Sequence, residues 1–207
     1  MAVCIHPTAM VDPSVALGDG SEIGAGVQIH RAAVVGRECL IAEHTSIAYG
    51  VTIGDRVRID AHVSLCSGVT LESGVMIAAG VIFTNDRYPR ACDPDTGALV
   101  RSARNEDTVH IVVRAGATIG AGTVIGPGIQ IGRYAMIGMG SVVAGHVPPH
   151  ALVFGNPARL RGYVCVCGAP LVDWSEHDEP VHCRRCGRAF DVSAEGSELH
   201  LNAGRMA

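Results

Sequence analysis

An apolar residue returns at every sixth position over most of this chain. Counting in sixes from Ile5 gives fourteen consecutive matches up to Phe83, and six more run from Val113 to Val143. A small or β-branched residue often stands two positions before each match, which places both on one face of a strand. Each hexad is therefore expected to supply an inward-facing pair followed by a turn. The repeat predicts an all-β fold of stacked short strands.

Composition narrows the classes of function. Aromatic residues make up only 4% of the chain and there are 26 glycines, as suits a repetitive core of small aliphatic side chains. The chain contains no lysine, which excludes a phosphate loop ending in Gly-Lys and a Schiff-base enzyme. A net charge of −4 without a basic stripe argues against nucleic-acid binding. We see neither a membrane-spanning run nor a secretory signal, and expect a cytoplasmic protein.

The repeat is interrupted once, between residues 84 and 112. This segment is too polar to form the wall of a repetitive β fold, and its charged residues are Asp86, Arg87, Arg90, Asp93, Asp95, Arg101, Arg104, Glu106 and Asp107. Long loops on a rigid scaffold are usually either functional or disordered. We expect an active-site loop, with a solvated insertion as the alternative.

The repeat resembles that of the hexapeptide-repeat family, whose fold is a left-handed parallel β-helix with three hexads per coil. Twenty hexads then make about seven coils, within residues 1–162. The segment "VVAGHVPPHALVFGNPARLRG", residues 142–162, is similar to the one that closes the helix in acetyl-CoA-dependent members. Family members are mostly acyltransferases that act as homotrimers, with acyl-CoA bound between subunits.

The stretch "FTNDRYPRA", residues 83–91, resembles a motif of nucleotide-sugar N-acetyltransferases that act on a 3-amino group. Their substrates are of the UDP-2-acetamido-3-amino-2,3-dideoxyglucuronate and dTDP-3-amino-hexose types. The resemblance implies acetyl transfer from acetyl-CoA by direct attack of the sugar amine on the thioester. Asn85 is expected to orient the amine, and Asp86 to accept its proton or hold the loop. Arg31, Arg87 and Arg90 are expected to bind the substrate.

Histidines and glycines spaced by 18 residues supply the other candidates. His44 and His62 are expected to stack on adjacent coils, and His62 is a candidate general base. An exposed histidine ladder is the alternative. Gly122 and Gly140 are expected to line one strip along which acyl-CoA binds, or else to serve only the turns. Pro157, Ala158 and Arg159 match the segment that meets the adenine end of CoA in relatives, and a guanidinium suits its phosphate.

Cysteine pairs follow the repeat. Cys165 and Cys167 precede Gly168, and Cys183 and Cys186 precede Gly187. Four thiolates suit tetrahedral zinc, and the pattern resembles a zinc ribbon over residues 163–192. His177 or His182 is an alternative ligand, and disulfides are an alternative pairing. The zinc is expected to be structural, and residues 193–207 to form a frayed tail.

Three other functions fit the same residues. An O-acetyltransferase of this fold would depend on a histidine base. An enzyme similar to the γ-class carbonic anhydrases would need a third histidine beside His44 and His62, and no convincing partner is identified. A non-catalytic scaffold subunit would not bind acetyl-CoA.

Overall fold

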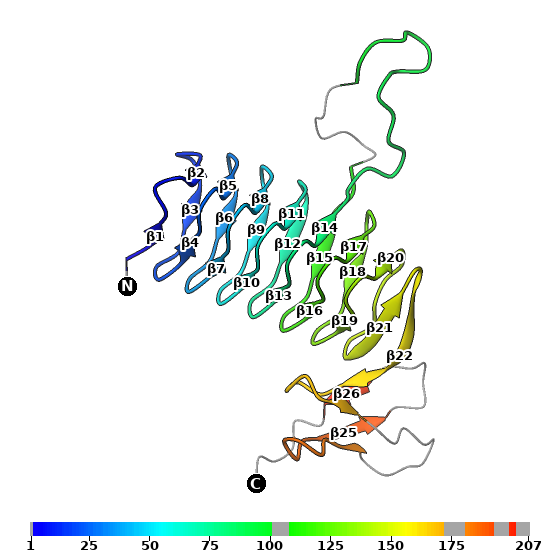
Figure 1. Ribbon diagram of the computed structural model, residues 1–207. Coiled ribbons are helices and arrows are strands. Elements are labelled where there is room, and N and C mark those ends of the chain that lie inside the picture. Colours follow the sequence, from blue (N-terminus) through cyan, green and yellow to red (C-terminus); the bar gives the residue numbers. More distant parts are fainter. Residues whose placement is uncertain (1, 101–107, 172–180, 193–198, 202–207) are drawn as a thin grey trace.

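A computed structural model describes residues 2–100, 108–171, 181–192 and 199–201 of this chain. The prediction of an all-β fold, a parallel β-helix followed by a small C-terminal module, is confirmed (Figure 1). Arg101, Arg104, Glu106, Asp107 and His177 lie outside the described residues. The described part of the chain holds no helix with the length and apolar character that a membrane crossing requires.

Three parallel sheets form the walls of the β-helix. The first contains β1 (Cys4–Ile5), β4 (Glu22–Ile23), β7 (Leu40–Ile41), β10 (Arg58–Ile59), β13 (Met76–Ile77), β16 (Thr118–Ile119), β19 (Met136–Ile137) and β21 (Ala151–Gly155). The second contains β2 (Met10–Val11), β5 (Gln28–Ile29), β8 (Ser46–Ile47), β11 (Ser64–Leu65), β14 (Ile82–Phe83), β17 (Val124–Ile125) and β20 (Val142–Val143). The third contains β3 (Ala16–Leu17), β6 (Val34–Val35), β9 (Thr52–Ile53), β12 (Val69–Leu71), β15 (Ile111–Val113) and β18 (Gln130–Ile131).

Each strand pairs with the strand three further along the chain, so one coil takes three hexads. Arg58 pairs with Leu40, 18 residues earlier, and the same offset recurs up to the interruption. Across the interruption Met76 pairs with Thr118, an offset of 42. The loop therefore inserts 24 residues, 42 minus 18, without shifting the register of the coils above it. Seven strands in the second sheet match the predicted number of coils, and β21 adds an eighth level to the first.

The hexad anchors fill the core, as predicted. From Ile23 onward every anchor is buried, and Cys39 is completely enclosed among them. Ile5 is 44% exposed because the first coil is covered by another coil on one side only. Where an inward position holds a hydroxyl, a backbone carbonyl accepts its proton; Ser21 Oγ, for example, donates to the carbonyl oxygen of Gly36 over 2.8 Å. The hydroxyl groups buried in the core thus have hydrogen-bond partners.

The β-helix continues directly into the C-terminal module. β21 pairs antiparallel with β22 (Ala158–Val164), which pairs with β23 (Pro170–Leu171). A separate antiparallel sheet contains β24 (Val181–His182), β25 (Ala189–Val192) and β26 (Leu199–Leu201). The sequence places residues 199–201 in a frayed tail. That is wrong for these three, because β26 pairs with β25.

Candidate active site and metal site

Turns between the sheets align in vertical columns, and two of these columns hold the candidate catalytic and binding residues. We call corner 1 the column between the first and second sheets, which contains Gly26, His44, His62, Gly80, Gly122 and Gly140. We call corner 2 the column between the second and third sheets, which contains Arg31, Tyr49, Ser67, Asn85, Pro127 and Gly145.

Corner 1 requires a left-handed backbone at every level. The φ angles of His44, His62, Gly122 and Gly140 are 56°, 59°, 66° and 67°. Histidine tolerates this region better than most residues that carry a Cβ, and glycine adopts it freely. Each of these amides donates to a carbonyl of the coil below, for example Gly140 N to Ala121 O over 2.8 Å. Gly122 and Gly140 therefore serve the turns, and their lack of side chains also leaves the upper half of this corner smooth.

The histidine ladder predicted for the lower half of corner 1 is present. The rings of His44 and His62 stack with centroids 5.2 Å apart and planes inclined by 13°. A Cβ on residue 26 would lie 2.6 Å from His44 Nδ1, so Gly26 is needed to make room for the ring. Both imidazoles are exposed. Their position is compatible with proton transfer and equally with a surface ladder.

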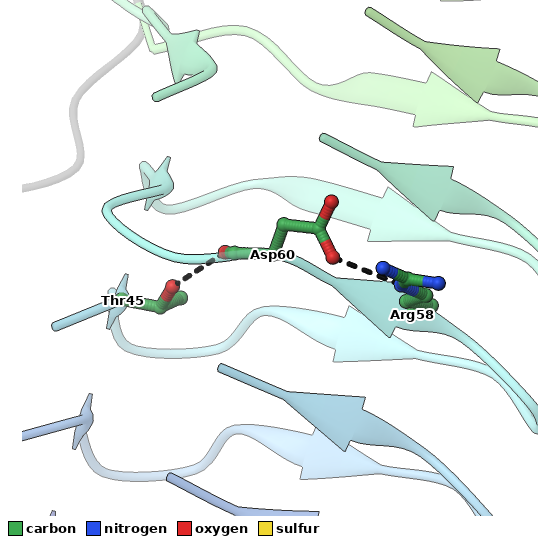
Figure 2. A network of polar contacts seen from close by, with 3 residues as sticks. All are labelled: Thr45, Arg58 and Asp60. Carbon is green, nitrogen blue, oxygen red and sulfur yellow. Dashed lines mark hydrogen bonds and ion pairs between the residues drawn. The ribbon is translucent and has the colours of Figure 1, made fainter. Parts of the chain in front are cut away.

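A polar network fixes the two histidine-bearing turns relative to each other. Thr45 Oγ1 donates to the backbone carbonyl of Asp60 over 3.1 Å (Figure 2). It also accepts from Val63 N over 3.3 Å. The Asp60 carboxylate in turn pairs with Arg58 Nε at 2.9 Å. Because Thr45 follows His44 and Asp60 precedes the turn of His62, this network holds both rings in register.

The hairpin between β21 and β22 lies above corner 1. The amide of Gly155 donates to Ser141 Oγ over 3.2 Å, which puts the hairpin beside the residue that follows Gly140. Pro157, joined to Asn156 by a cis peptide bond, and Ala158 form the tip. Exposed Arg159 follows on β22, and with Ala158 it borders a hollow of about 280 Å³ whose lining includes Gly145 of corner 2. The start of the hairpin therefore continues the line of Gly122 and Gly140, whereas Arg159 lies toward the top of corner 2.

Asn85 is anchored at corner 2, at the base of the loop. Its Nδ2 donates to the backbone carbonyl of Ser67 over 2.8 Å and to Ser67 Oγ over 2.9 Å. Its own backbone carbonyl accepts from Val109 N over 3.1 Å. Because Nδ2 is engaged by Ser67, the end of the side chain left to accept a hydrogen bond from a ligand amine would be Oδ1. This is the polarity that orienting an amine requires.

The loop extends away from the stacked coils (Figure 1). Asp86 pairs with Thr108 at the base, and Cys92 pairs with Leu99 further out. Exposed Arg87 turns back toward the helix, because a Cβ on Gly128 would lie 3.7 Å from its Nη2. The structure thus keeps Asn85, Asp86 and Arg87 together at corner 2. Arg90 is exposed on the projecting part, where its Nη1 donates to Pro89 O over 2.9 Å.

Cys66 lies beside the start of this loop without having the properties of a nucleophile. Burial raises the pKa of its thiol to about 11, and the nearby Asp86 carboxylate acts in the same direction. The thiol is therefore neutral at physiological pH, and the thiolate is the reactive form. This supports the expectation that Cys66 packs rather than reacts.

Two residues that the sequence reasoning missed complete corner 2. Tyr49 lies on the coil above Arg31, whose guanidinium carbon is 5.2 Å from the centroid of the Tyr49 ring. Ser67, on the next coil, is the anchor of Asn85. Both stand at 18-residue intervals below Asn85, so the spacing that identified the histidine ladder contained this column as well. An arginine on an aromatic ring, followed by a positioned amide, gives this corner a ligand-binding character.

The structure separates the predicted site residues into two groups. His62, Gly122, Gly140 and the hairpin of Pro157 follow corner 1, whereas the substrate and loop residues follow corner 2. The second sheet lies between the two corners. Within one copy of the chain, the candidate cofactor and substrate residues therefore do not converge on one point.

A second cluster, formed by Cys165, Cys167, Cys183 and Cys186, has the geometry of a metal site. All four sulfur atoms lie within 4.8 Å of one another; Cys165 Sγ and Cys186 Sγ are 3.4 Å apart, and Cys167 Sγ and Cys183 Sγ 3.6 Å. A disulfide needs about 2.05 Å. Tetrahedral zinc with bonds of about 2.3 Å needs sulfur atoms about 3.8 Å apart. The donor set fits such an ion, whereas His182 is not part of the cluster.

Groups around Cys186 favour the charged form that binds metals. The backbone and side chain of Arg188 donate to this sulfur and lower the pKa of the thiol to about 6. The exposed guanidinium of Arg185 adds a bond from its Nη1 to Cys167 O over 3.3 Å. Two arginines therefore lie beside the cluster, whereas burial raises the pKa of the Cys165 thiol to about 12.

His150 lies between the last coil and this module. Its buried position leads us to expect that the stability of the fold depends on pH. The ring is 5% exposed, and burial lowers its pKa below the usual value near 6.5. Below pH 6.5 the unfolded chain therefore binds a proton more readily than the folded one. Above that pH, His150 does not lower the free energy of unfolding. Below it, His150 lowers the free energy of unfolding by at most about 1.4 kcal/mol per pH unit. Thermal unfolding at pH 7.5 and 5.5 should show a larger loss for the native protein than for His150→Asn; equal losses would contradict this.

Comparison with known proteins finds the same repeat on both sides of the loop. The model described as bacterial transferase hexapeptide (six repeats) matches residues 50–85 and 110–145. The matched coils carry the six-residue repeat of that family. A candidate acetyltransferase of Bacillus cereus has a solved structure that is 26% identical, with a TM-score of 0.51, over 76% of this chain and 78% of that one.

Two curated relatives match shorter segments. The dTDP-3-amino-3,6-dideoxy-alpha-D-galactopyranose 3-N-acetyltransferase of Aneurinibacillus thermoaerophilus is 47% identical over 60 residues, 29% of this chain. The serine acetyltransferase of Salmonella typhimurium is 37% identical over 73 residues, 35% of this chain. The matched segments cover 31% and 26% of those relatives' own length.

Proposed function

We propose that this chain is an acetyl-CoA-dependent N-acetyltransferase that acylates the amino group of a nucleotide-linked amino sugar. The observation that carries the proposal is the fixed amide of Asn85, which presents Oδ1 at the base of the polar loop. The likeness of "FTNDRYPRA" to the motif of such enzymes supports it. So does the 47% identity to a segment of a sugar 3-N-acetyltransferase.

The chemistry asks little of the protein beyond positioning. The neutral sugar amine attacks the thioester carbonyl, a C–N bond forms, and the C–S bond breaks with CoA leaving as the thiolate. Thiols ionise near pH 8.5, so this leaving group is good. Asn85 Oδ1 accepts an amine N–H and aims the nitrogen lone pair. Asp86, or His62 from another copy, receives the proton that the nitrogen loses. Positioning of this kind contributes several kcal/mol to catalysis.

The separation of the two corners supports a site shared between copies of the chain. In a ring of three parallel helices, each copy uses one corner against its first neighbour and another against its second. Corner 1 of one copy, with Gly122, Gly140 and the hairpin of Pro157, then faces corner 2 of the next, with Asn85. We therefore propose a homotrimer with acyl-CoA and the amino sugar bound between subunits. Both substrates are cytoplasmic metabolites, and the proposed activity places the protein there.

Thiolate chemistry supports one structural zinc ion per chain, held by Cys165, Cys167, Cys183 and Cys186. The four sulfur atoms occupy all four positions of a tetrahedral ion, so this ion has no open position for a substrate or water. It is distant in the chain from Asn85, and its proposed role is to fold the module.

Release of free thiol from acetyl-CoA tests the proposed activity. We expect turnover with a UDP- or dTDP-linked 3-amino sugar and at least about a hundredfold less with the matching sugar that carries a hydroxyl at that carbon, because a neutral hydroxyl is a weaker nucleophile than a neutral amine and needs a general base. The product should gain one acetyl mass on nitrogen. Preferential acetylation of the hydroxyl sugar would overturn the assignment in favour of O-acetyl transfer. No turnover on any acceptor, with acetyl-CoA still bound, would overturn the amino-sugar proposal.

A further inference from the structure

We propose that the metal ion bound by the four cysteines closes the C-terminal end of the β-helix, by holding the β24–β25 hairpin against the last coil so that Phe190 covers His150. The inference rests on the proposed zinc site and does not depend on the acetyl-transfer proposal.

One half of the metal site belongs to the β-helix itself. Val164, the last residue of β22, donates its amide to His150 O over 2.7 Å. The carbonyl oxygen of Val164 lies 3.0 Å from His150 Nδ1. Cys165 follows at once, and its turn closes with Gly168 N donating to Cys165 O over 2.8 Å. The first cysteine pair is thus fastened to the last coil whether or not a metal is bound.

The other half is the β24–β25 hairpin, whose second strand also pairs with β26. Val181 pairs with Phe190 and His182 with Ala189, and Gly187 N closes the second cysteine turn on Cys183 O at 2.8 Å. Cys186 Sγ lies 3.4 Å from Cys165 Sγ, Cys183 Sγ lies 3.6 Å from Cys167 Sγ, and exposed Arg185 donates from Nη1 to Cys167 O over 3.3 Å. An ion bridging the four sulfur atoms would therefore link this hairpin to the cysteine pair that is fastened to the last coil.

The hairpin brings a fully buried ring to the end of the β-helix. Phe190 is 0% exposed, and its ring meets that of His150 edge-on, with centroids 5.4 Å apart and planes inclined by 77°. His150 also stacks on Tyr134 of the coil below at 5.4 Å. The Tyr134 ring in turn lies so close over Gly116 that no Cβ would fit there. A column of rings thus continues one corner of the β-helix into the module.

An end cap answers a general need of repeat folds. A terminal coil has no further coil to cover its apolar interior or its free strand edge, so solenoids require capping elements. At this end β22 and β23 cover the edge of β21, and Phe190 covers the ring column. A module of about 30 residues has too small a core to remain folded without a covalent or metal link. Binding of the metal is therefore expected to fold the module and, with it, to close the C-terminal end of the β-helix.

Hydrogen exchange with and without metal tests this coupling on the full chain. Native protein is expected to carry one zinc per chain by elemental analysis. Stripping with a chelator under reducing conditions is expected to raise amide exchange at least about tenfold in residues 181–192 and around His150 and Val164, because local opening exposes them. Residues 22–77, far along the coils, serve as the internal reference and should not change.

Variants separate the metal from the cap. Cys186→Ser should weaken zinc binding about a hundredfold or more and reproduce the exchange of stripped protein, because one of four ligands is lost. Cys4→Ser, at an exposed thiol on the first coil, is the matched control and should behave as native. Phe190→Ala should keep its zinc yet show raised exchange at His150 and Val164.

Two outcomes would overturn the inference, and they differ. Bound zinc whose removal leaves exchange at His150 and Val164 unchanged would refute the cap and leave the metal site standing. Protein purified and reconstituted under reducing conditions that takes up no zinc would refute the metal assignment and the cap together. Neither outcome bears on acetyl transfer, which the thiol-release assay measures separately.

Discussion

Asn85→Ala is expected to lower kcat/KM for the amino sugar by about 10²–10³, the loss typical of removing one positioned polar group at a reacting centre. The physical reason is that only Oδ1 of this residue is presented to the ligand, while Nδ2 is bound to Ser67. Alanine leaves the amine without its orienting acceptor. Thiol release at saturating acetyl-CoA, with the sugar concentration varied, measures the effect.

Two further variants make this result specific to Asn85. Ser67→Ala removes the bond to Oγ and keeps the one to the backbone carbonyl, so its loss of activity should be smaller, about tenfold or less. Cys92→Ser, on the exposed part of the loop, should behave as native. Activity that survives Asn85→Ala and disappears in His62→Ala would move the chemistry to the histidine ladder.

The hexad period carried most of the fold prediction because parallel stacking leaves the register no freedom. With the three hexads per coil that the family resemblance implies, residues 18 apart lie one above another, so the His44–His62 stack followed from the resemblance and the spacing together. The interruption preserved this property. Its 24 inserted residues leave at the same corner to which they return, and Met76 still pairs with Thr118.

The arrangement of the site was harder to predict, because it depends on which side of the prism each turn occupies. His62 and Asn85 both lie in turns of the repeat, yet they belong to different corners, and sequence reasoning treated them as one site. Ser67 belongs to no recognisable motif, so its role as the anchor of Asn85 could be identified only from the hydrogen bond between them in the structure. Docking of Phe190 on His150 arises from tertiary packing between elements with no shared period.

Mixing two inactive variants is expected to restore activity, which is the largest effect that the two-corner arrangement predicts. Ala121→Trp places a bulky ring at an exposed position of corner 1 beside Gly122, and should block acyl-CoA. Asn85→Ala disables corner 2. Alone, each variant should fall at least about a hundredfold below native activity. Unfolded and refolded together in equal amounts, they should regain about a quarter of native activity, since one site in four then pairs two intact corners from neighbouring copies.

The control for this recovery is a mixture in which no site can be complete. Ala121→Trp mixed with the double variant Ala121→Trp/Asn85→Ala contains a blocked corner 1 in every copy and should remain inactive. Native mass spectrometry of differently tagged chains verifies that subunits have exchanged. Exchanged trimers of the two single variants that stay inactive would mean that both corners of a working site come from one chain. Because the second sheet separates Asn85 from Gly122 within a single copy, recovery is the outcome expected of the proposed trimer with sites between copies.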